Sequence, residues 1–545
     1  MDGGWPFTFV RYTFWMPAVH LEVEKKYAVD DAFELPPLPE LVLCADDGHR
    51  AVDPSAPVVE GEPVRQELRA TYFDTADLRL ASAGMTLRRR TGGDDAGWHL
   101  KVPAGGGARS EVRHPLGRAA RTVPDPLRKM VWVHSRGAVL RPVAEIVTDR
   151  AVRRLVDATG QVLAEVADDR VTARRLLRAG GSREGIDVAT SWREIEVELV
   201  GGTSELLAAV DARLRAWGLT AAGSSSKLAR LLQGEQDERS APGKAQQKGG
   251  KPTAKSTAGE VVLAHVREQV EQMQAQDLPV RLDTRDGIHK MRVATRRLRS
   301  ALTTFKPLFE ADAARALRGE LKWLAAELGA ARDAEVMRDR VAAAVGVDDG
   351  NSGAAATGAG AELDQAYREA HDRVLAELDG ERYRRLLESL DGLVGSPPFT
   401  GRAGDRAGKV LPRLVARSFT GVRRLVEEAA ARPAGAEREE LLHDARKAAK
   451  AARYAGETVA PVFGQDATAF AQAMEAVQEA LGEHQDSVLT RQRLRELALS
   501  TSSTETAFLY GRLHALEEAR AEQFEHRFED AWKAAGRRPL HRWLR

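Results

Sequence analysis

The stretch HLEVEKK, residues 20–26, decides the fold of the first part of the chain. Side chains alternate between the two faces of a strand, so Glu22, Glu24 and Lys26 share one face while the other face is apolar. Two carboxylates followed by an ammonium suit a site that holds a divalent cation together with a phosphate chain, because carboxylates bind hard cations and ammonium groups bind anions. The motif carries weight only if other strands supply matching charged faces.

Three further stretches repeat this pattern, each with charge of one sign on a single face. Adjacent like charges destabilise a strand by up to ~1 kcal/mol each, so opposite charges must lie close by. An antiparallel sheet with one solvated face is the simpler interpretation, but such faces usually mix the two signs. We therefore expect a barrel that turns these faces inward around a polar lumen, suited to a polyanion and a divalent cation. The residues concerned are Arg88 and Arg90, Lys101, and Glu194, Glu196 and Glu198.

Composition limits the class of protein. The 545 residues are many for one core, so two or more domains are expected. The charges nearly cancel, with 81 basic and 80 acidic residues, and the single cysteine, Cys44, excludes an internal disulfide and a cysteine-based metal cluster. No apolar run approaches the ~18 residues of a membrane span, and residues 1–15 lack the basic start and apolar core of a signal peptide. A cytoplasmic protein is expected.

Composition also divides the chain into segments. Short alternating strands give way to SAPGKAQQKGGKPTAKSTAG at 240–259, which has the composition of a flexible linker. From Glu260 onward Ala, Leu, Arg and Glu recur with a 3.6-residue period, which predicts helices. A low-complexity stretch at 346–362 predicts a long loop between two of them. The expected segments are an N-terminal extension at 1–16, a β-rich domain at 17–232, a linker at 233–259 and an all-α domain at 260–535.

The all-α segment contains an internal repeat. IHKMR at 288–292 is matched by LHDAR at 442–446, and LGAARD at 328–333 is matched by LGEHQD at 481–486. The offsets between the two copies are 154 residues for the histidines and 153 for the closing aspartates, an agreement that chance rarely produces. We therefore expect two related halves of about four helices each. Their expected limits are 260–395 and 405–535.

A basic helical face recurs in both halves. His289, Arg292, Arg296 and Arg299 are spaced 3, 4 and 3 residues apart, so they fall within an arc of roughly 80°. A single face of this kind is usually just solvated, but two copies at one spacing favour a shared anion-binding role. Metal ligation is disfavoured because neither histidine has a second histidine one turn away, and nucleic acid is disfavoured because aromatic residues are not interleaved. The second copy comprises His443, Arg446, Lys450 and Arg453.

The β-rich segment resembles a CYTH domain, the triphosphate tunnel metalloenzyme family, whose eight-stranded antiparallel barrel hydrolyses or converts triphosphates. The resemblance rests on E-x-E-x-K at 22–26, Y-F-D-T at 72–75, L-R-R-R at 87–90 and the closing S-K at 226–227. Lys101, Arg150 and Glu165 with Asp168 fit intervening strands. Where many members carry a second acid two residues after the acid at Glu111, this chain has Arg113, which leaves the metal geometry of that strand open.

The CYTH resemblance implies roles for these residues. Glu22, Glu24 and Lys26 are implied as the catalytic group, with a metal-positioned water attacking the terminal phosphorus. The triphosphate is implied to bind Lys26, Arg88, Arg90, Lys101, Arg150 and Lys227. The Mg²⁺ or Mn²⁺ ligands are implied among Glu22, Glu24, Asp168, Glu194, Glu196 and Glu198.

The helical segment resembles a CHAD domain, a conserved-histidine α-helical module that is often fused to CYTH. The resemblance rests on the two H-x-x-R helices and the two L-G-x-x segments, and it spans most of 260–535. The family is associated with binding inorganic polyphosphate in a basic groove between its halves. The implied groove residues are His289, Arg292, Arg296, Arg299, Arg332, His443, Arg446, Lys450 and Arg453, with Gln485 in place of Arg332 in the second copy.

Together these patterns predict an α+β multidomain protein with an N-terminal antiparallel β-barrel tunnel and flanking helices, followed by an all-α domain of two four-helix halves. The predicted function is metal-dependent hydrolysis of tripolyphosphate or an organic triphosphate, with polyphosphate binding by the helical domain. One alternative is a non-catalytic polyphosphate-binding or granule-targeting protein with a vestigial tunnel, which Arg113 favours. Another is an adenylyl cyclase of the CYTH type. No membrane partner is expected, and polyphosphate granules are a possible location in the cytoplasm.

Overall fold

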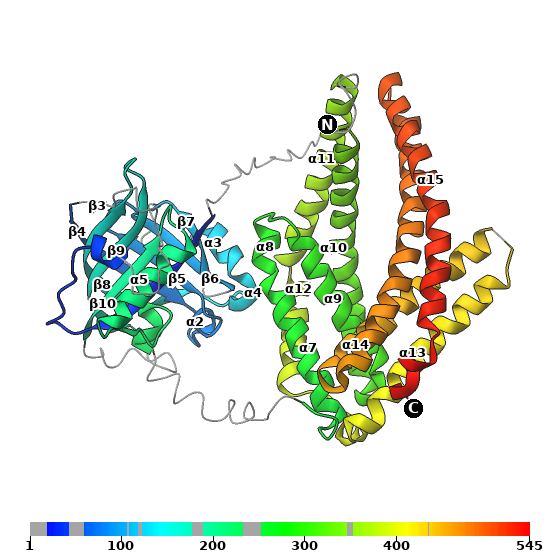
Figure 1. The fold of residues 1–545 in the computed structure, drawn as a ribbon, viewed down its shortest axis with the longest axis horizontal. Coiled ribbons are helices and arrows are strands. Elements are labelled where there is room, and N and C mark those ends of the chain that lie inside the picture. The colour runs from blue at the N-terminus through cyan, green and yellow to red at the C-terminus, as the bar shows by residue number, and fades with distance from the viewer. Residues whose placement is uncertain are drawn as a thin grey trace, which may run out of the picture. The chain divides into compact units, whose positions relative to one another are not determined.

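The computed structural model describes residues 19–42, 59–60, 62–105, 108–117, 122–176, 189–232, 252–345, 353–433 and 435–544. The chain forms two compact units, residues 1–246 and 247–545, the first rich in strands and the second helical (Figure 1). The extension predicted at 1–16 and Cys44 lie outside the described residues. Within the described part, none of the helices has both the length and the hydropathy required to cross a membrane.

One antiparallel sheet forms the first unit, in the order β1-β7-β6-β5-β4-β8-β9-β10-β2-β11, with β3 paired to β8. Its longest strand, β8, has 16 residues, and the right-handed twist of paired strands gives such a sheet its curl. The strands are β1 (Val19–Glu22), β2 (Glu24–Val29), β3 (Val59–Glu60), β4 (Val64–Asp74), β5 (Thr86–Thr91), β6 (Gly97–Gly105), β7 (Ala108–His114), β8 (Arg141–Val156), β9 (Val162–Arg175), β10 (Thr190–Leu199) and β11 (Thr220–Ala221).

The stretch 19–29 brings the two ends of this sheet together. β1 pairs with β7 at one end of the strand order, and β2 pairs with β10 at the other. Only Val23 separates β1 from β2, and its carbonyl accepts a hydrogen bond from the Leu199 N–H at 3.1 Å. The motif HLEVEKK therefore lies where the sheet curls back on itself, and the predicted fold class is confirmed.

The outer face of the sheet is covered by helix α5 (Ser204–Ala216). Tyr27, Ile195 and Val197 are fully buried, and they pack with the apolar face of α5 in one cluster. Burial of each such side chain stabilises the fold by roughly 1.5–3 kcal/mol. The helix begins at Thr203, whose side chain accepts the Leu206 N–H. Because apolar residues alternate with charged ones, this packing turns the charged faces of β2 and β10 inward. Shorter helices are α1 (Pro39–Val42), α2 (Arg79–Ser82), α3 (Asp125–Met130) and α4 (Trp132–Ser135).

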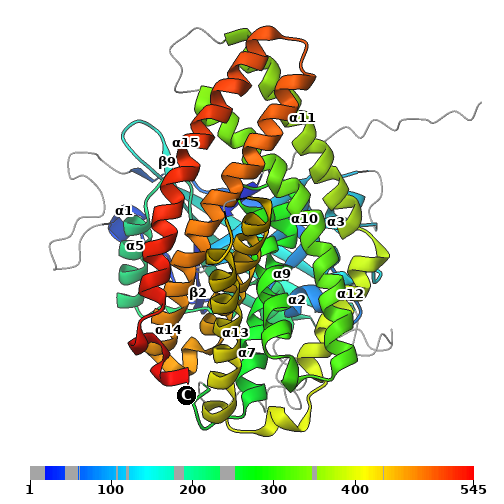
Figure 2. The same cartoon turned by 90° about the vertical axis from the view of Figure 1, so that its right-hand side faces the viewer.

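The second unit consists of long helices packed side by side (Figures 1 and 2). Its first helix starts at Thr257, which forms a reciprocal capping box with Glu260, so residues 258–259 belong to the helix rather than to the predicted linker. The predicted loop at 346–362 is also too long, because a helix begins at Gly353 in its Ala-rich part. The helices are α7 (Ala258–Ala275), α8 (Asp277–Arg281), α9 (Gly287–Thr304), α10 (Ala311–Val345), α11 (Gly353–Leu378), α12 (Glu381–Gly395), α13 (Ala407–Ala430), α14 (Ala436–Ser500) and α15 (Thr504–Ala535), with 3₁₀ turns at Lys306–Leu308, Gly401–Gly404 and Arg538–Leu544.

The internal repeat is visible in the way α14 is built. Gly464 has φ 60° and ψ −136°, which is not helical, so α14 consists of a first arm up to this glycine and a second arm after it. The first arm corresponds to α9 and the second arm to α10. On α9, Met291, Leu298 and Leu302 are fully buried, as the 3.6-residue period predicts. The opposite side of α9 is left for the basic residues.

Candidate functional site

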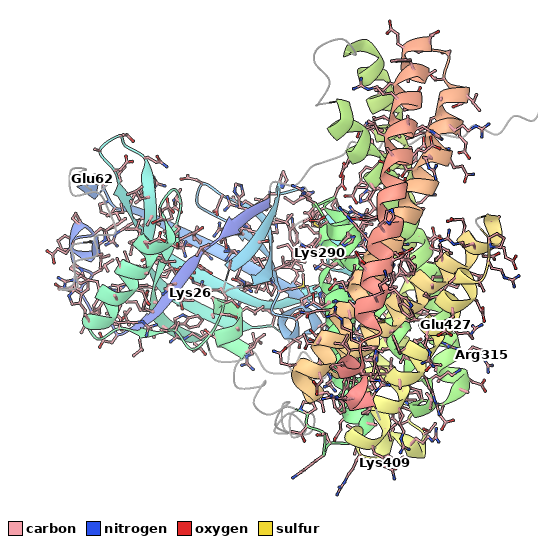
Figure 3. The ribbon with its side chains drawn as sticks, turned by 45° about the vertical axis from the view of Figure 1, so that its right-hand side comes forward. Lys26, Glu62, Lys290, Arg315, Lys409 and Glu427 are labelled. Atoms are coloured by element: carbon pink, nitrogen blue, oxygen red, sulfur yellow. The ribbon has the colours of Figure 1, made fainter. Side chains whose placement is uncertain are left out.

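A cavity of about 390 Å³ lies inside the curled sheet, and most of the residues that line it are charged. We call this cavity the lumen. Lys26 projects from the strand that crosses the wall of this unit (Figure 3). Most of the residues implied by the sequence meet here. The lining includes Glu22, Glu24, Lys26, Arg88, Arg90, Lys101, Arg150, Glu196, Glu198 and Lys227.

One end of the lumen is closed by the segment 226–232. Leu228, Leu231 and Leu232 of this segment are buried in a cluster with Tyr72 and Val143. At the other end the lining residues are open to solvent, since Val200 is 60% exposed. The lumen thus has a closed end, which we call the blind end, and an open end, which we call the mouth.

Lys227 neutralises an acidic triad at the blind end. Its Nζ lies 2.7 Å from Asp169 Oδ2, 2.7 Å from Glu196 Oε1 and 2.9 Å from Glu194 Oε1. These three buried acids lie close enough together to hold a metal ion, but the ammonium already lies among them. Although burial opposes the effect, the charges of Lys227 and Arg150 hold the pKa of Asp169 and of Glu196 below its ordinary value. The positive charge that balances the triad therefore comes from side chains of the protein itself.

A second group of acids has less positive charge around it. We call Glu22, Glu24 and Glu198 the acidic wall; Glu24 lies directly opposite Glu198 across the β2–β10 pair. Burial, together with the charges of Glu22 and Glu24, raises the pKa of Glu198 to about 7. Burial, opposed by Lys101 at 2.6 Å, also raises the pKa of Glu22. A raised carboxyl pKa marks negative charge that its neighbours do not offset, so this wall favours an added cation.

A cationic wall formed by Arg88, Arg90 and Arg150 faces the lumen. Burial and the charges of Arg88 and Arg150 lower the pKa of Arg90 to about 9. Arg88 contacts the Tyr72 hydroxyl at 3.4 Å, and despite burial the charges of Arg88, Lys227 and Lys101 lower the pKa of this phenol. Such concentrated positive charge favours a polyanion. Tyr72 stood in the quoted Y-F-D-T motif, but its alternation with the buried Phe73 was the only signal that it reaches the lumen.

Arg113 removes Glu111 from the carboxylates that a cation can use. Glu111 is almost completely buried; its Oε2 accepts a hydrogen bond from Arg113 Nε at 2.5 Å, and its Oε1 lies 2.8 Å from His99 Nδ1. Although burial opposes the effect, the hydrogen bond with His99 and the charge of Lys101 lower the pKa of Glu111. Because Arg113 and His99 both contact the Glu111 carboxylate, β7 offers no carboxylate that is free to bind a metal. His99 itself is a residue near the lumen that sequence reasoning missed.

The assignment of Asp168 to the metal ligands is wrong. Its carboxylate accepts two hydrogen bonds from Arg193, at 2.8 and 2.7 Å, on the outer side of the sheet. The next residue, Asp169, faces inward and binds Arg150 through two hydrogen bonds of 2.8 and 2.6 Å. Alternation along β9 from the lumen-facing Glu165 identifies Asp169, because residues four apart share a face.

The basic residues of the two halves meet in the helical unit. We call His289, Arg292, Arg296 and Arg299 the basic face of α9; Lys290 beside them is exposed to solvent (Figure 3). Burial and the charges of Arg296, Arg332 and Arg446 lower the pKa of Arg292, although Asp333 opposes them. Arg296 also donates a hydrogen bond to the Tyr454 hydroxyl on the first arm of α14 at 3.3 Å. The two copies of the repeat therefore contribute to one positive region.

Two of the implied groove residues already have carboxylate partners. Arg453 binds Glu457 at 2.8 Å and Glu475 at 2.7 Å, and Arg332 binds Glu335 at 2.6 Å. Arg453 is thus part of an ion-pair network rather than an exposed anion ligand. Glu475 belongs to the second arm of α14, so its pairing with Arg453 on the first arm depends on tertiary structure. His443, Arg446 and Lys450 lie half-buried on the first arm.

Comparison with known proteins assigns both units. The CYTH domain model matches residues 57–231, and the CHAD domain model matches residues 264–495. The chain is 37% identical over 533 residues to the uncharacterized proteins MT2285 and Rv2226 of Mycobacterium tuberculosis (strains CDC 1551 / Oshkosh and ATCC 25618 / H37Rv), covering 94% of this chain and 96% of each relative.

Three solved structures show weaker similarity to the chain. PptA from Streptomyces chartreusis matches at 22% identity and a TM-score of 0.42 over 51% of this chain and 100% of that one. The CHAD domain of the plant Ricinus communis matches at 24% identity and a TM-score of 0.43 over 53% of this chain and 95% of that one. A putative adenylate cyclase from Bacillus halodurans matches at 16% identity and a TM-score of 0.22 over 39% of this chain and 97% of that one.

Proposed function

The chain belongs to the proteins that join a CYTH domain to a CHAD domain, and we propose that it combines a metal-dependent triphosphatase with a polyphosphate-binding module. The observation that carries the enzymatic part is the separation of charge in the lumen. The triad at the blind end is neutralised by Lys227 and Arg150, whereas the acidic wall is neutralised only in part, by Lys101 at Glu22 and Lys26 at Glu24, and the pKa of Glu198 is raised; the cationic wall lies beside it. This arrangement suits a divalent cation and a polyphosphate together.

The acidic wall fits the implied metal. Glu22, Glu24 and Glu198 offer only carboxylate oxygens, which Mg²⁺ and Mn²⁺ prefer, and their mutual repulsion would be relieved by a cation. A Mg²⁺ or Mn²⁺ ion bound there would neutralise charge on the phosphate oxygens and position a water molecule for attack on the terminal phosphorus.

The chain's own cations bind and orient the substrate. Arg88 and Arg150 would hold non-bridging phosphate oxygens from the cationic wall, and Lys101 and Lys26 would do so from the side of the acidic wall. As the bond from water to the terminal phosphorus forms and the bond to the bridging oxygen breaks, these cations stabilise the charge left on the departing diphosphate group. The products are orthophosphate and the shortened chain.

Phosphate release tests this proposal. Tripolyphosphate, ATP and thiamine triphosphate are each incubated with the protein and Mg²⁺ or Mn²⁺, for the wild type, Glu24→Ala and the control Glu145→Gln, whose residue pairs with Arg174 outside the lumen. We expect release with at least one substrate, its loss in Glu24→Ala and its retention in the control. Absence of metal-dependent turnover of any of them would overturn the enzymatic proposal.

Two other functions are separated by the same assay. A cyclase would convert ATP into a cyclic nucleotide and diphosphate without releasing orthophosphate. A non-catalytic polyphosphate-binding protein is favoured by Arg113, which occupies Glu111, and it would retain polyphosphate without turnover. In either case the cytoplasm, including polyphosphate granules, is the proposed location.

Polyphosphate binding by the helical unit is supported by the basic face of α9 and by Arg446, whose charge reaches Arg292 from the other half. Counterion release makes binding to a linear polyanion strong and dependent on salt. We expect Arg292→Ala with Arg446→Ala to lose most retention on immobilised polyphosphate. Arg315→Ala is the matched control, because Arg315 is exposed on α10 and pairs only with Asp312 among the described residues (Figure 3). Unchanged retention in the double variant would overturn the assignment of the groove.

A further inference from the structure

Two buried glycines in the repeated L-G motifs lie against the arginines of the repeated H-x-x-R motifs. A Cβ atom built on Gly482, in the second arm of α14, would lie 3.0 Å from both Nε and Nη2 of Arg446. A Cβ atom built on Gly329, in α10, would lie 3.6 Å from both Nε and Nη2 of Arg292. In each half, all three of the nearest atoms belong to that one guanidinium group.

The same contact recurs at the spacing of the repeat. Arg446 follows Arg292 by 154 residues, and Gly482 follows Gly329 by 153. The two motifs are more than 30 residues apart within each half, and the antiparallel packing of α9 on α10, and of one arm of α14 on the other, brings them together. The repeated feature is therefore a glycine–arginine pair rather than two separate motifs.

Other helical glycines in the described part of the chain have different neighbours. Gly319, on the same helix as Gly329, has no atom within 4 Å of a built Cβ, and neither has Gly511 on α15. Gly456 faces Phe470 and Ala471, which indicates close helix packing. Only Gly329 and Gly482, among the described glycines, have an arginine head group as the nearest neighbour.

We propose that Gly482 is a positioning residue that sets Arg446 in the anion-binding groove, and that Gly329 is its looser counterpart beside Arg292. The inference rests on the proposed polyphosphate binding. A glycine in a helix interior costs about 1 kcal/mol relative to alanine, and here the missing side chain gives the guanidinium group room to lie against the helix. The guanidinium is thereby held at a fixed depth beside the positive charges of the other half.

The two glycines differ in the distance from a built Cβ atom to the arginine head group, so the proposal predicts different effects of alanine at the two positions. At 3.0 Å an added methyl group overlaps the Arg446 head group, whereas 3.6 Å is ordinary van der Waals contact. The obstructing atoms are the far end of a flexible side chain, so the guanidinium moves and the backbone does not. Alanine at Gly482 therefore displaces an anion ligand without disturbing the fold, and alanine at Gly329 leaves its arginine in place.

The test compares Gly482→Ala, Gly329→Ala and the control Gly319→Ala in the full chain. Affinity for linear inorganic polyphosphate is measured by calorimetry, and stability by thermal unfolding. We expect Gly482→Ala to weaken binding about three- to tenfold, the loss of roughly one charge-assisted hydrogen bond. Gly329→Ala and Gly319→Ala should change affinity by less than about twofold, and all three should unfold at the wild-type temperature or higher, because alanine favours the helix.

A double-mutant cycle separates this inference from the proposed function. If Arg446→Ala binds polyphosphate as the wild type does, the proposed role of Arg446 fails. If Arg446→Ala weakens binding but Gly482→Ala does not, the positioning role of Gly482 is overturned. We expect Gly482→Ala to cause no further loss in an Arg446→Lys background, because the slender ammonium does not meet the new methyl group; an additive loss would also overturn the inference. This last comparison remains decisive if Gly482→Ala lowers the unfolding temperature.

Discussion

The lumen of the β-rich unit and the basic face of α9 both gather cationic side chains, but they are built differently. In the lumen, cations and carboxylates alternate around a cavity, and Lys26 alone contacts Glu24 and Glu196. On α9, Arg292 and Arg299 have lowered pKa values because burial and neighbouring arginines act on them with little acidic compensation. The first arrangement suits the proposed binding of a metal and an anion together, whereas the second suits the proposed binding of anions alone.

The lumen and the basic face of α9 also differ in how far their charged side chains contribute to the stability of the fold. Several lumen charges, Lys227 and Arg150 among them, are held by partners on neighbouring strands, so removal of one leaves another charge buried. The arginines of the helical face repel one another, so removal of one relieves repulsion. Substitutions in the lumen should therefore alter stability as well as activity, and those on the basic face should alter binding alone.

The largest effect is expected at Lys227. Lys227→Met leaves Asp169, Glu194 and Glu196 buried around an apolar group, and we expect a loss of about 3–5 kcal/mol in the free energy of unfolding, as for a broken buried ion pair. Added Mg²⁺ or Mn²⁺ should restore part of that loss by occupying the vacated triad. Urea unfolding with EDTA or with metal measures both effects, and Lys25→Met, at a partly exposed pair with Asp211, is the control. Wild-type stability in Lys227→Met would contradict the neutralised triad.

The next effect is on turnover. Glu24→Gln keeps the size of the side chain but removes one charge from the acidic wall, and we expect kcat/KM for the hydrolysed triphosphate to fall by about 100-fold or more. Excess Mn²⁺ should recover part of the activity, because weaker metal binding can be offset by mass action. Glu145→Gln serves again as the outer-face control. If Glu24→Gln were as active as the wild type, the acidic wall would not be needed for turnover, and the proposed difference between the lumen and the basic face of α9 would be wrong.

A smaller effect is expected on the basic face. Replacing Arg292 and Arg446 together by alanine should weaken polyphosphate binding about 30-fold at low salt and reduce the steepness of its salt dependence. Thermal stability and phosphate release from tripolyphosphate should match the wild type, because neither arginine lies in the lumen. A large loss of stability would show that these arginines support the fold in the way the lumen charges do.

Sequence reasoning succeeded where side-chain alternation within one strand or helix determines the outcome. Glu22, Glu24 and Lys26 line one wall because strands alternate, and the repeat located α9 and α14 because its spacing is helical. It failed at Asp168, because two adjacent aspartates offer no internal clue to which one faces inward unless the strand is counted from a fixed point. It did not find the pairing of Arg453 with Glu475, because that contact arises only through the fold of α14. The contact between Arg446 and Gly482 likewise could not be predicted from the sequence, because it arises from helix packing in three dimensions.

The smallest effect is a dependence of metal binding on pH. Glu198 has its pKa raised to about 7 by burial and by Glu22 and Glu24, so it binds a proton over a pH range in which the unfolded chain does not. Without metal, stability should therefore fall as the pH rises from about 5 to 7, because the folded state loses that proton. Affinity for Mn²⁺ should rise about tenfold between pH 6 and pH 8, because the ligand must be ionised. Calorimetric titration with Mn²⁺ at both pH values measures the change, and Glu198→Gln should flatten it. If the affinity of Glu198→Gln for Mn²⁺ still changed steeply between pH 6 and pH 8, the titrating group would be another acid. The pKa of Glu198 would then no longer distinguish the lumen from the basic face of α9.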